Sequence, residues 1–493
     1  MGKRRALIKP DVIDLHPIPS ICGAASSLAI FMEYLQGHAR YQTKRLKELN
    51  GSISIEAIEK TFSDFGFDSG LSHLPAAGLL AGILRLSTLS EHKTKTYPFY
   101  HYTTNAHALR KISNENQKPS YIDLFCGAGG LSLGLEQAGF KHAFSLDNDP
   151  WSIYTYRFNR PWIAADSAIC CDIMSFNPST HDFSSVDILC AGIPCQSFSL
   201  ANQQRKEADP RDGLYLHYLN CVKIWRPKVA LIENVSGFAK VNSDVVQSLE
   251  TLGYSVGSTL VEVAAMGLPQ YRKRLVYIAA RNYENRQGAQ IVGSAIRELK
   301  ASMNHAPIPL SDAILDLPRL RPCTVSNRPG YESEATGFGA TLKPEINGEI
   351  SKYCAAINSG RSRQMCYNHK ARFNNDRDIE IFSRLRPGED STAPSISKIM
   401  PYKSRAHVFK DKYYKLRPNT PCRTITSHMR YDCNTYIHPL EPRGLTAREA
   451  ARVQGFPDDY VFCGTFQRTY QQIGNAVPPP LARQIGDCII RQL

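Results

Sequence analysis

The chain has 493 residues, of which 42% are hydrophobic and 21% are charged, a composition that argues against a fibrous or wholly disordered protein. This length exceeds what one ordinary hydrophobic core accommodates, so we expect two or three domains. The formal net charge of +14 favours a polyanionic partner such as a nucleic acid, because lysine and arginine side chains displace counterions from phosphates.

The 14 cysteines contain no Cys-x-x-Cys pair, and the Cys170–Cys171 doublet has no partner doublet at zinc-finger spacing. The sequence therefore predicts neither a disulfide scaffold nor a metal site. The basic start of the chain lacks an apolar run of signal-peptide length, and no later run approaches the length of a membrane span. These features predict a reduced, cytoplasmic protein.

Residues 1–118 form an N-terminal extension in this interpretation. Helices are predicted over 54–67 and 76–86, but no motif there connects to a chemical mechanism. The role of this extension stays open.

From Ser120 to Ala280, short apolar runs alternate with stretches of helical period. This alternation is typical of a mostly parallel sheet that is doubly wound with helices, an α/β fold that binds ligands along one edge of the sheet. We assign residues 119–300 to a catalytic and cofactor-binding domain.

Residues 301–438 break this pattern and are rich in Arg, Asn, Ser, Pro and Tyr, which indicates a second, smaller domain. The C-terminal segment, 439–493, regains regular structure and is expected to return to the catalytic domain. Within it, 445–460 predicts a capped helix followed by a turn, and 472–493 predicts a loop that enters a closing helix.

The motif DLFCGAGG, residues 123–130, follows an apolar run and precedes a helical stretch. Glycines in such a turn let a ligand approach the backbone, although dinucleotides, phosphates and plain tight turns use similar patterns. Asp147 ends the next apolar run, where a carboxylate can accept hydrogen bonds from a ribose diol. Asp172 follows the third apolar run, and Phe125 could cover an adenine ring. The ordered set predicts an adenosine-containing cofactor.

A second motif, PCQSFS, follows the apolar run DILCAG. Cys190 lies inside that run and is expected to be structural, whereas Pro194 places Cys195 on an exposed turn where a thiol can reach a substrate. A free thiol has a pKa of about 8.5, so nearby positive charge would help it react at neutral pH. Glu233 ends another apolar run and should reach the same edge of the sheet.

Arg272 and Arg274 are two residues apart, so on a strand they would point to one face. Taken alone, this spacing is most simply explained by a solvated basic face.

In their order along 119–493, the motifs DLFCGAGG, PCQSFS, ENV, QYRKR, REAARVQGFP and QIGNAVPPP resemble the DNA cytosine-5 methyltransferase family of the bacterial modification type. The resemblance implies a Rossmann-like methyltransferase fold that binds S-adenosyl-L-methionine and double-stranded DNA. It implies that the Cys195 thiolate adds to carbon 6 of a flipped-out cytosine and that Glu233 holds a proton at the ring nitrogen. Arg274 would bind the ring carbonyl oxygen, and Arg272 would steady the active site.

The same resemblance assigns the binding residues and the region that reads DNA. Contacts with the cofactor are implied for Phe125, Gly127, Gly129, Gly130, Leu131, Asp147, Asp172, Ile173, Pro194, Asn475 and Val477. Contacts with DNA are implied for Gln196, Ser197, Arg205, Gln270 and Thr424. Residues 301–438 correspond to the target-recognition domain of the family.

A modification enzyme of this kind would act as a monomer on the bacterial nucleoid, beside a restriction endonuclease that cuts the same site. A tRNA cytosine-5 methyltransferase is the nearest alternative, and the sizeable basic second domain favours DNA over it. A methyltransferase-like DNA-binding regulator is a second alternative, against which Cys195, Glu233 and Arg274 argue. A Rossmann dehydrogenase is discounted, because the usual third glycine spacing is absent.

Overall fold

The computed structural model describes residues 118–160, 163, 165–194, 213–324, 350–359, 368–401, 412–462 and 466–493. The sheet strands are β1 (Ser120–Leu124), β2 (Lys141–Asp147), β3 (Ala168–Cys170), β4 (Ile188–Gly192), β5 (Val229–Asn234), β6 (Tyr254–Glu262) and β7 (Lys273–Arg281). They form one sheet in the order β3-β2-β1-β4-β5-β7-β6.

Strands β1 to β5 run parallel to one another, and β7 runs antiparallel to both β5 and β6. The chain moves outward from β1 through β2 to β3, then returns to place β4 on the other side of β1. Ligands of open α/β sheets bind at such a reversal of strand order. The mostly parallel α/β sheet expected from the sequence is confirmed.

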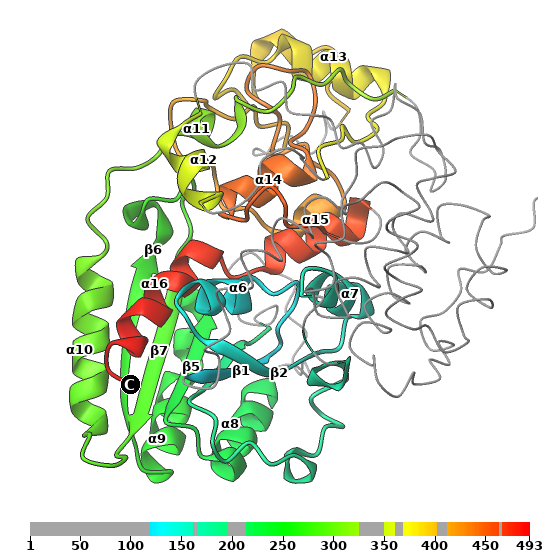
Figure 1. The fold of residues 1–493 in the computed structure, drawn as a ribbon. Coiled ribbons are helices and arrows are strands. Elements are labelled where there is room, and N and C mark those ends of the chain that lie inside the picture. Colours follow the sequence, from blue (N-terminus) through cyan, green and yellow to red (C-terminus); the bar gives the residue numbers. More distant parts are fainter. Residues whose placement is uncertain are drawn as a thin grey trace, which may run out of the picture.

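Helices cover both faces of the sheet (Figure 1). The helices of this part are α6 (Gly130–Gln137), α7 (Pro150–Phe158), α8 (Leu214–Trp225), α9 (Asn242–Thr251), α10 (Gly288–Ala301) and α16 (Pro479–Ile490). Side chains of α6, α10 and α16 share one core with one face of the strands, and α8 and α9 share another core with the opposite face.

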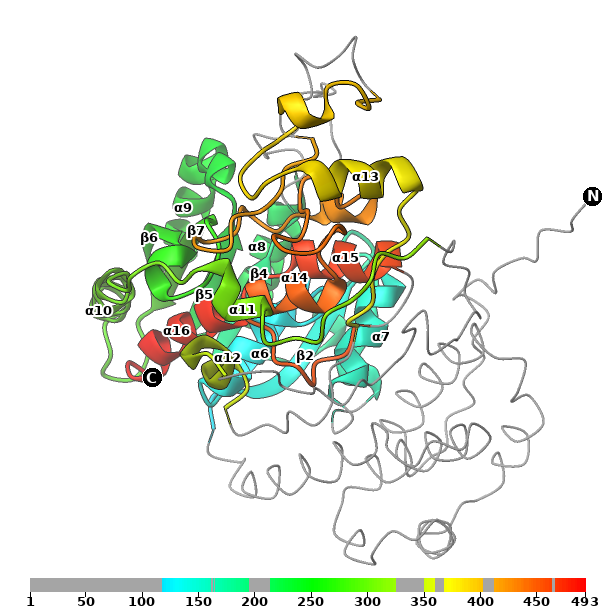
Figure 2. The same ribbon diagram turned by 90° about the horizontal axis from the view of Figure 1, so that it is seen from above.

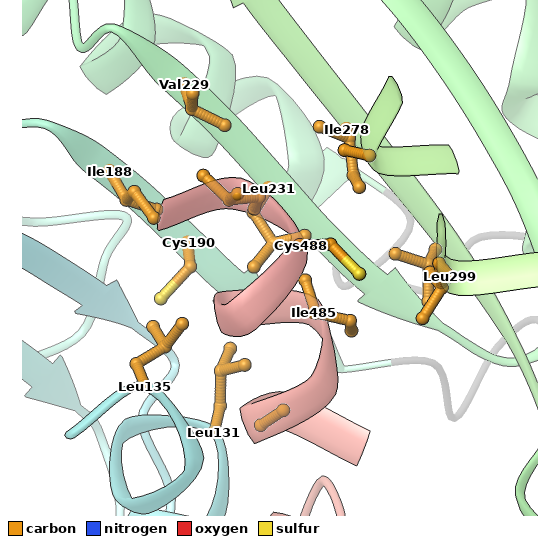
Figure 3. Close-up of a cluster of buried hydrophobic side chains, with 14 of the residues drawn as sticks. Leu131, Leu135, Ile188, Cys190, Val229, Leu231, Ile278, Leu299, Ile485 and Cys488 are labelled. Carbon is orange, nitrogen blue, oxygen red and sulfur yellow. The ribbon is translucent and has the colours of Figure 1, made fainter. Parts of the chain in front are cut away.

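Alternation along the strands divides the side chains between these two cores. Ile188 and Cys190 of β4 point toward α6 and α16, together with Leu231 of β5 (Figure 3). Leu189 and Ala191 point toward α8. Because successive strand residues face opposite sides, both faces of β4 are apolar and the strand is a continuous hydrophobic run.

A second group of helices lies beyond the carboxyl ends of the parallel strands (Figures 1 and 2). Its helices are α11 (Leu310–Ile314), α12 (Lys352–Ile357), α13 (Asp376–Arg384), α14 (Ala447–Val453) and α15 (Phe466–Asn475). Short 3-10 helices occur at Ala165–Ser167, Pro178–Thr180, Ser236–Val241, Val263–Met266, Pro394–Ile396 and Ser427–Arg430. Apart from α13, the helices of this group share one hydrophobic core.

That core divides the C-terminal segment. Helices α14 and α15 pack with α11 and α12, whereas α16 packs on the sheet beside α6. We call the described residues within 302–476 the second lobe, and those within 118–301 and 477–493 the catalytic lobe.

Helix α14 begins where the sequence predicted a capped helix. Thr446 accepts a hydrogen bond from the Glu449 backbone, and the Glu449 side chain accepts one from the Thr446 backbone. The loop predicted to begin at residue 472 starts later, because α15 continues to Asn475. Pro479 then opens α16, where a missing backbone N–H costs nothing. Among the helices that the structure describes, none is long and apolar enough to cross a membrane.

Candidate active site

Glu233 and Arg274 form a buried ion pair at the carboxyl ends of the central strands. The Glu233 Oε1 atom lies 2.8 Å from Arg274 Nε, and the two side chains are 7% and 12% exposed. Antiparallel pairing of β5 with β7 places Glu233 opposite Val276, which brings Arg274 to the same strand end. The guanidinium therefore fixes the carboxyl group at the edge where a ligand is expected.

The end of β4 lies beside this pair. Gly192 of β4 is in register with Glu233 of β5, and the Asn234 side chain donates to the Ile193 carbonyl over 3.2 Å. A Cβ atom at Gly192 would lie 3.3 Å from Val477 Cγ2, so a larger residue would crowd the C-terminal loop. Pro194 is half-buried and is the last described residue of this segment. Cys195, Gln196, Ser197 and Arg205 lie outside the described residues.

Arg272 connects three parts of the chain just before β7. Its side chain is 2% exposed and donates to the carbonyls of Ile425 over 2.7 Å and Ala476 over 3.0 Å. Its backbone N–H donates to Glu262. Although the spacing predicted one face for both arginines, Arg274 binds Glu233 and Arg272 holds the second lobe and the C-terminal loop against the strand.

Gln270 and Thr424 were both expected at the DNA. The Gln270 side chain is fully buried, donates to Val453 and Gln454, and accepts from the backbone of Ile425. Gln270 therefore cannot contact DNA directly in this structure, because both the nitrogen and the oxygen of its side-chain amide are hydrogen-bonded inside the protein. Thr424 is half-buried, and its hydroxyl donates to the Tyr271 carbonyl over 2.5 Å.

The turn after β1 has the backbone shape that a glycine-rich ligand loop requires. Phe125, Gly127 and Gly129 all have positive φ, at 63°, 53° and 85°. The Asp147 carboxylate accepts from the backbone N–H of Gly127 and of Asp149, each over 2.8 Å. Burial raises the pKa of Asp147 to about 6. The acid that ends β2 thus lies directly against the turn after β1.

The glycines of this turn have different surroundings. A Cβ atom at Gly127 would meet nothing within 4 Å. One at Gly129 would come within 2.6 Å of the Arg160 side chain, and one at Gly130 within 2.2 Å of the Val477 carbonyl. Gly129 and Gly130 are therefore required by packing of the protein against itself, whereas Gly127 faces open space.

The remaining residues expected at the cofactor come from several elements. Leu131 and Ile173 are buried in the cores on opposite faces of the sheet. Asp172 is exposed and accepts from the Met174 backbone over 2.9 Å. Asn475 is exposed at the end of α15, and Val477 is 7% exposed. A carboxylate beside open backbone fits a ligand with a ribose diol, as an adenosyl group has.

Asp123, which the sequence reasoning did not single out, lies fully buried beneath the same turn. Its Oδ2 atom accepts from the Ser132 hydroxyl over 2.6 Å, and burial raises the pKa of Asp123 to about 7. Its position as the first residue of DLFCGAGG was the available signal. Among the described residues, no group of three or more His, Cys, Asp or Glu side chains could hold a metal ion.

Comparison with known proteins gives consistent matches. The family profile described as C-5 cytosine-specific DNA methylase matches residues 120–491. The type II methyltransferase M.PspPI of Psychrobacter sp. (strain TA137) is 34% identical and covers 76% of this chain and 79% of its own. The type II methyltransferase M.AgeI of Thalassovita gelatinovora is 30% identical and covers 75% of this chain and 98% of its own.

A crystal structure supports the fold separately. It is that of a prophage-encoded E. coli protein described as a DNA modification methyltransferase, and it matches with a TM-score of 0.57 and 23% identity. The match covers 76% of this chain and 99% of that protein. The family, the cofactor S-adenosyl-L-methionine, the DNA substrate and the methyltransferase activity expected from the sequence are confirmed. The chain belongs to the C-5 cytosine-specific DNA methylase family, an enzyme class that transfers a methyl group from S-adenosyl-L-methionine to carbon 5 of cytosine in DNA.

Proposed function

We propose that Cys195 is the nucleophile of this DNA methyltransferase and that Glu233, held by Arg274, is its acid partner. The buried Glu233–Arg274 pair is the observation that carries this proposal. It lies in register with the end of β4, and Cys195 follows that strand end by three residues. A nucleophile, a carboxyl group and a guanidinium at one strand edge are the set that addition to a cytosine ring requires.

The proposed reaction activates carbon 5 by adding a group at carbon 6. The Cys195 thiolate forms a bond to carbon 6, while Glu233 supplies a proton at ring nitrogen 3, which is conjugated with carbon 6, and so neutralises the negative charge that the addition creates. S-Adenosyl-L-methionine supplies an electrophilic methyl group when it is bound. Carbon 5 takes that methyl group and then loses its own proton to a base. The electrons of that C–H bond restore the ring double bond as the bond to Cys195 breaks, and the ring nitrogen returns its proton to Glu233. Reaching this geometry requires the cytosine to leave the base stack.

Arg274 and Arg272 have different proposed roles. Arg274 orients Glu233 and would donate to the ring carbonyl oxygen. Arg272 is a positioning residue, because its guanidinium is bonded to the carbonyls of Ile425 and Ala476. Asp147 and the Phe125–Gly130 turn are proposed to bind the adenosyl group, with Asp172, Asn475 and Val477 around it.

We further propose that 301–438 is the target-recognition domain and that Thr424 lies near the DNA. The stretch 196–213, which contains Arg205, would complete the DNA contacts. The curated relatives are named type II methyltransferases. We accordingly propose that the enzyme methylates one short sequence, as a monomer in the bacterial cytoplasm, beside an endonuclease of the same specificity.

The first test measures transfer of label from S-adenosyl-L-methionine to unmethylated genomic DNA, followed by mapping of 5-methylcytosine. Wild-type protein should methylate one short sequence. Cys195→Ser should lose essentially all activity, and Glu233→Gln should lose about 100-fold or more, within the range of general acid catalysis. Retained activity in Cys195→Ser would contradict the proposed nucleophile.

A second test traps the covalent step. In the presence of S-adenosyl-L-methionine, a duplex with 5-fluorocytosine at the mapped position should form a stable adduct with the wild-type protein, because carbon 5 then carries fluorine and, once methylated, has no proton to lose. The adduct should appear on a denaturing gel and should be absent for Cys195→Ser. An adduct that persists in this variant would assign the attack to another residue.

A further inference from the structure

The segment 457–462, between α14 and α15, is attached to both lobes by side-chain amides. The Asn159 amide, at the end of α7, donates to the Val461 carbonyl over 2.8 Å and accepts from its N–H over 2.9 Å. Asn368 of the second lobe makes the same two bonds with Phe462, each over 2.9 Å. Two hydrogen bonds from one amide fix both the position and the orientation of the backbone that they hold. The segment therefore links Asn159 of the catalytic lobe to Asn368 of the second lobe.

Tyr460 extends from this segment to the turn after β1. Its side chain is 2% exposed, and its ring packs against Phe456 and Phe462, with centroids 5.0 and 5.5 Å away. The Tyr460 hydroxyl donates to the Ala128 carbonyl and accepts from Arg160 Nη1 over 3.0 Å. A second-lobe side chain thus bonds directly to the glycine-rich turn of the catalytic lobe.

Arg160 holds the next carbonyl of the same turn. Its side chain is 1% exposed, and its Nη2 atom donates to Gly129 over 3.1 Å. Its Nε atom pairs with Glu136 over 2.7 Å, and its guanidinium lies 4.1 Å from the centre of the Tyr156 ring. The guanidinium is therefore fixed on several sides before it reaches the turn.

Two consecutive carbonyls, those of Ala128 and Gly129, are consequently set by Tyr460 and Arg160. Gly129 has φ of 85° and is the N-cap residue before α6, where it makes no side-chain cap. A carbonyl and the following N–H belong to one rigid peptide plane. Fixing these carbonyls therefore fixes the direction of the N–H groups of Gly129 and Gly130, where α6 starts.

We propose that Tyr460 is a positioning residue of the cofactor site and that, with Arg160, it couples the placement of the second lobe to the geometry of the glycine-rich turn. The inference rests on the proposed assignment of that turn to S-adenosyl-L-methionine. Tyr460 acts through the Ala128 carbonyl and needs no contact with the cofactor. If the second lobe shifts when it binds DNA, cofactor affinity changes, and by linkage the cofactor changes DNA affinity by the same factor.

The test is Tyr460→Phe in the full-length protein, which removes the hydroxyl and keeps the ring. Calorimetric titration should show that the Kd for S-adenosyl-L-methionine rises about tenfold, equivalent to about 1.4 kcal/mol, because the Ala128 carbonyl loses the hydrogen bond that orients it. The KM for this cofactor should rise similarly, while kcat at saturating cofactor and DNA changes less than about threefold. A purely structural role would lower the amount of folded protein and leave KM unchanged.

Coupling is measured with S-adenosylhomocysteine, which does not react when DNA is present. In wild-type protein its Kd should differ between free protein and protein bound to the target duplex. In Tyr460→Phe that difference should shrink toward none. An unchanged ratio would overturn the coupling.

Tyr254→Phe is the matched control. The Tyr254 hydroxyl is buried and donates to the Pro227 carbonyl over 2.6 Å, at the opposite edge of the sheet from Glu233. This variant should lose comparable thermal stability and keep the wild-type Kd for the cofactor. Equal Kd values in Tyr460→Phe, Tyr254→Phe and wild type would overturn the proposed role of Tyr460.

Asp147→Asn separates the inference from the site on which it rests. If Asp147→Asn weakens cofactor binding and Tyr460→Phe does not, only the inference fails. If Asp147→Asn leaves the Kd unchanged, the assigned cofactor site is wrong, and with it the inference.

Discussion

The two lobes satisfy their buried backbone in different ways. In the catalytic lobe, strand ladders pair the backbone of the sheet, the cores on both of its faces are apolar, and the buried Arg160 and Arg272 bond where the second lobe meets it. In the second lobe, short helices are joined by long irregular segments, and Arg443, Arg448 and Arg452 are 2% exposed or less. Buried backbone groups must be paired in either case.

The buried arginines supply the hydrogen bonds that regular structure would otherwise provide. Arg448 donates to the carbonyls of Pro457 and Tyr460, and Arg452 donates to the carbonyl of Ala313 while it pairs with Asp458. A guanidinium offers five donors in a fixed plane, so one side chain can satisfy several carbonyls. An irregular chain can therefore be fixed in place when charged side chains, in place of a strand ladder, bond its backbone carbonyls.

The largest expected effect concerns Arg443, whose guanidinium makes two bonds to Glu449, of 2.8 and 2.7 Å. Burial alone would raise the pKa of Glu449, but Arg443 overcomes this and holds the pKa well below its usual range. Arg443→Met should reduce the free energy of unfolding by about 3–5 kcal/mol, measured by urea denaturation, because it leaves a buried charge without its partner.

The control for Arg443→Met is Arg384→Met, which breaks an exposed pair with Glu380. It should cost less than about 1 kcal/mol. If the two variants were equally stable, buried ion pairs would not hold the second lobe and the comparison would fail.

The catalytic lobe should instead be sensitive to cavities. Leu231 is fully buried between β4, α16 and β7 (Figure 3). Leu231→Ala should cost about 3 kcal/mol, because it removes apolar contacts and leaves a void. Denaturation monitored in the same buffer tests this value. A loss of less than about 1 kcal/mol in the free energy of unfolding would mean that the sheet core repacks around the void. It would contradict the expected sensitivity of the catalytic lobe to cavities.

Acid should affect the surroundings of the second-lobe histidines and of Asp123 in opposite directions. Burial lowers the pKa of His369 to about 4 and of His438 to about 3, so these second-lobe histidines are neutral when folded. Their contribution to stability is complete above the ordinary pKa of about 6.5 and is lost as the pH falls toward 4. Burial raises the pKa of Asp123 to about 7, so this carboxyl stabilises the folded protein increasingly as the pH falls through this value, whereas the buried His142 of the same lobe, with its pKa lowered to about 3, acts in the opposite direction.

Hydrogen exchange at pH 7 and pH 5, corrected for intrinsic rates, measures this difference. Each group should contribute roughly 2 kcal/mol over this range, lowering protection around His369 and raising it around Asp123. Asp123→Asn should abolish the gain in protection around Asp123 and leave the protection around His369 unchanged. Parallel loss of protection around both groups would contradict the assignment.

The smallest expected effect concerns cofactor binding. Burial raises the pKa of Asp147 to about 6, and the ionised carboxylate is the better acceptor for a ribose diol. The Kd for S-adenosyl-L-methionine should therefore rise about tenfold between pH 7 and pH 5, since the ionised fraction falls by about that factor. In Asp147→Asn this pH dependence should disappear. A persistent dependence would point to another group.

Much of the catalytic lobe could be predicted because its signals are local. The apolar runs at β1, β2, β4 and β5 indicated strands, and parallel pairing explains why Asp147 and Glu233 lie at one edge of the sheet. The capping box of α14 was likewise visible as Thr446 followed by Glu449. These features depend on side-chain period and on residues three apart, which a sequence displays directly.

The second lobe was less predictable because its contacts join distant residues. Gln270 bonds to Gln454, and Arg272 bonds to Ile425 and Ala476. No spacing in the sequence indicates such partners. Gln270 and Arg272 are buried because they pack against elements more than 150 residues away in the sequence, and this burial keeps Gln270 from direct contact with DNA.

The sequence by itself determined the α/β class, the order of the motifs, the family and the types of residue available for chemistry. The tertiary structure decided which of two arginines binds Glu233, which glycine faces open space, and how Tyr460 and Arg160 hold the turn after β1. The physical reason is that periodicity and composition act locally along the chain. Hydrogen bonds and ion pairs between side chains form only after folding brings remote residues together.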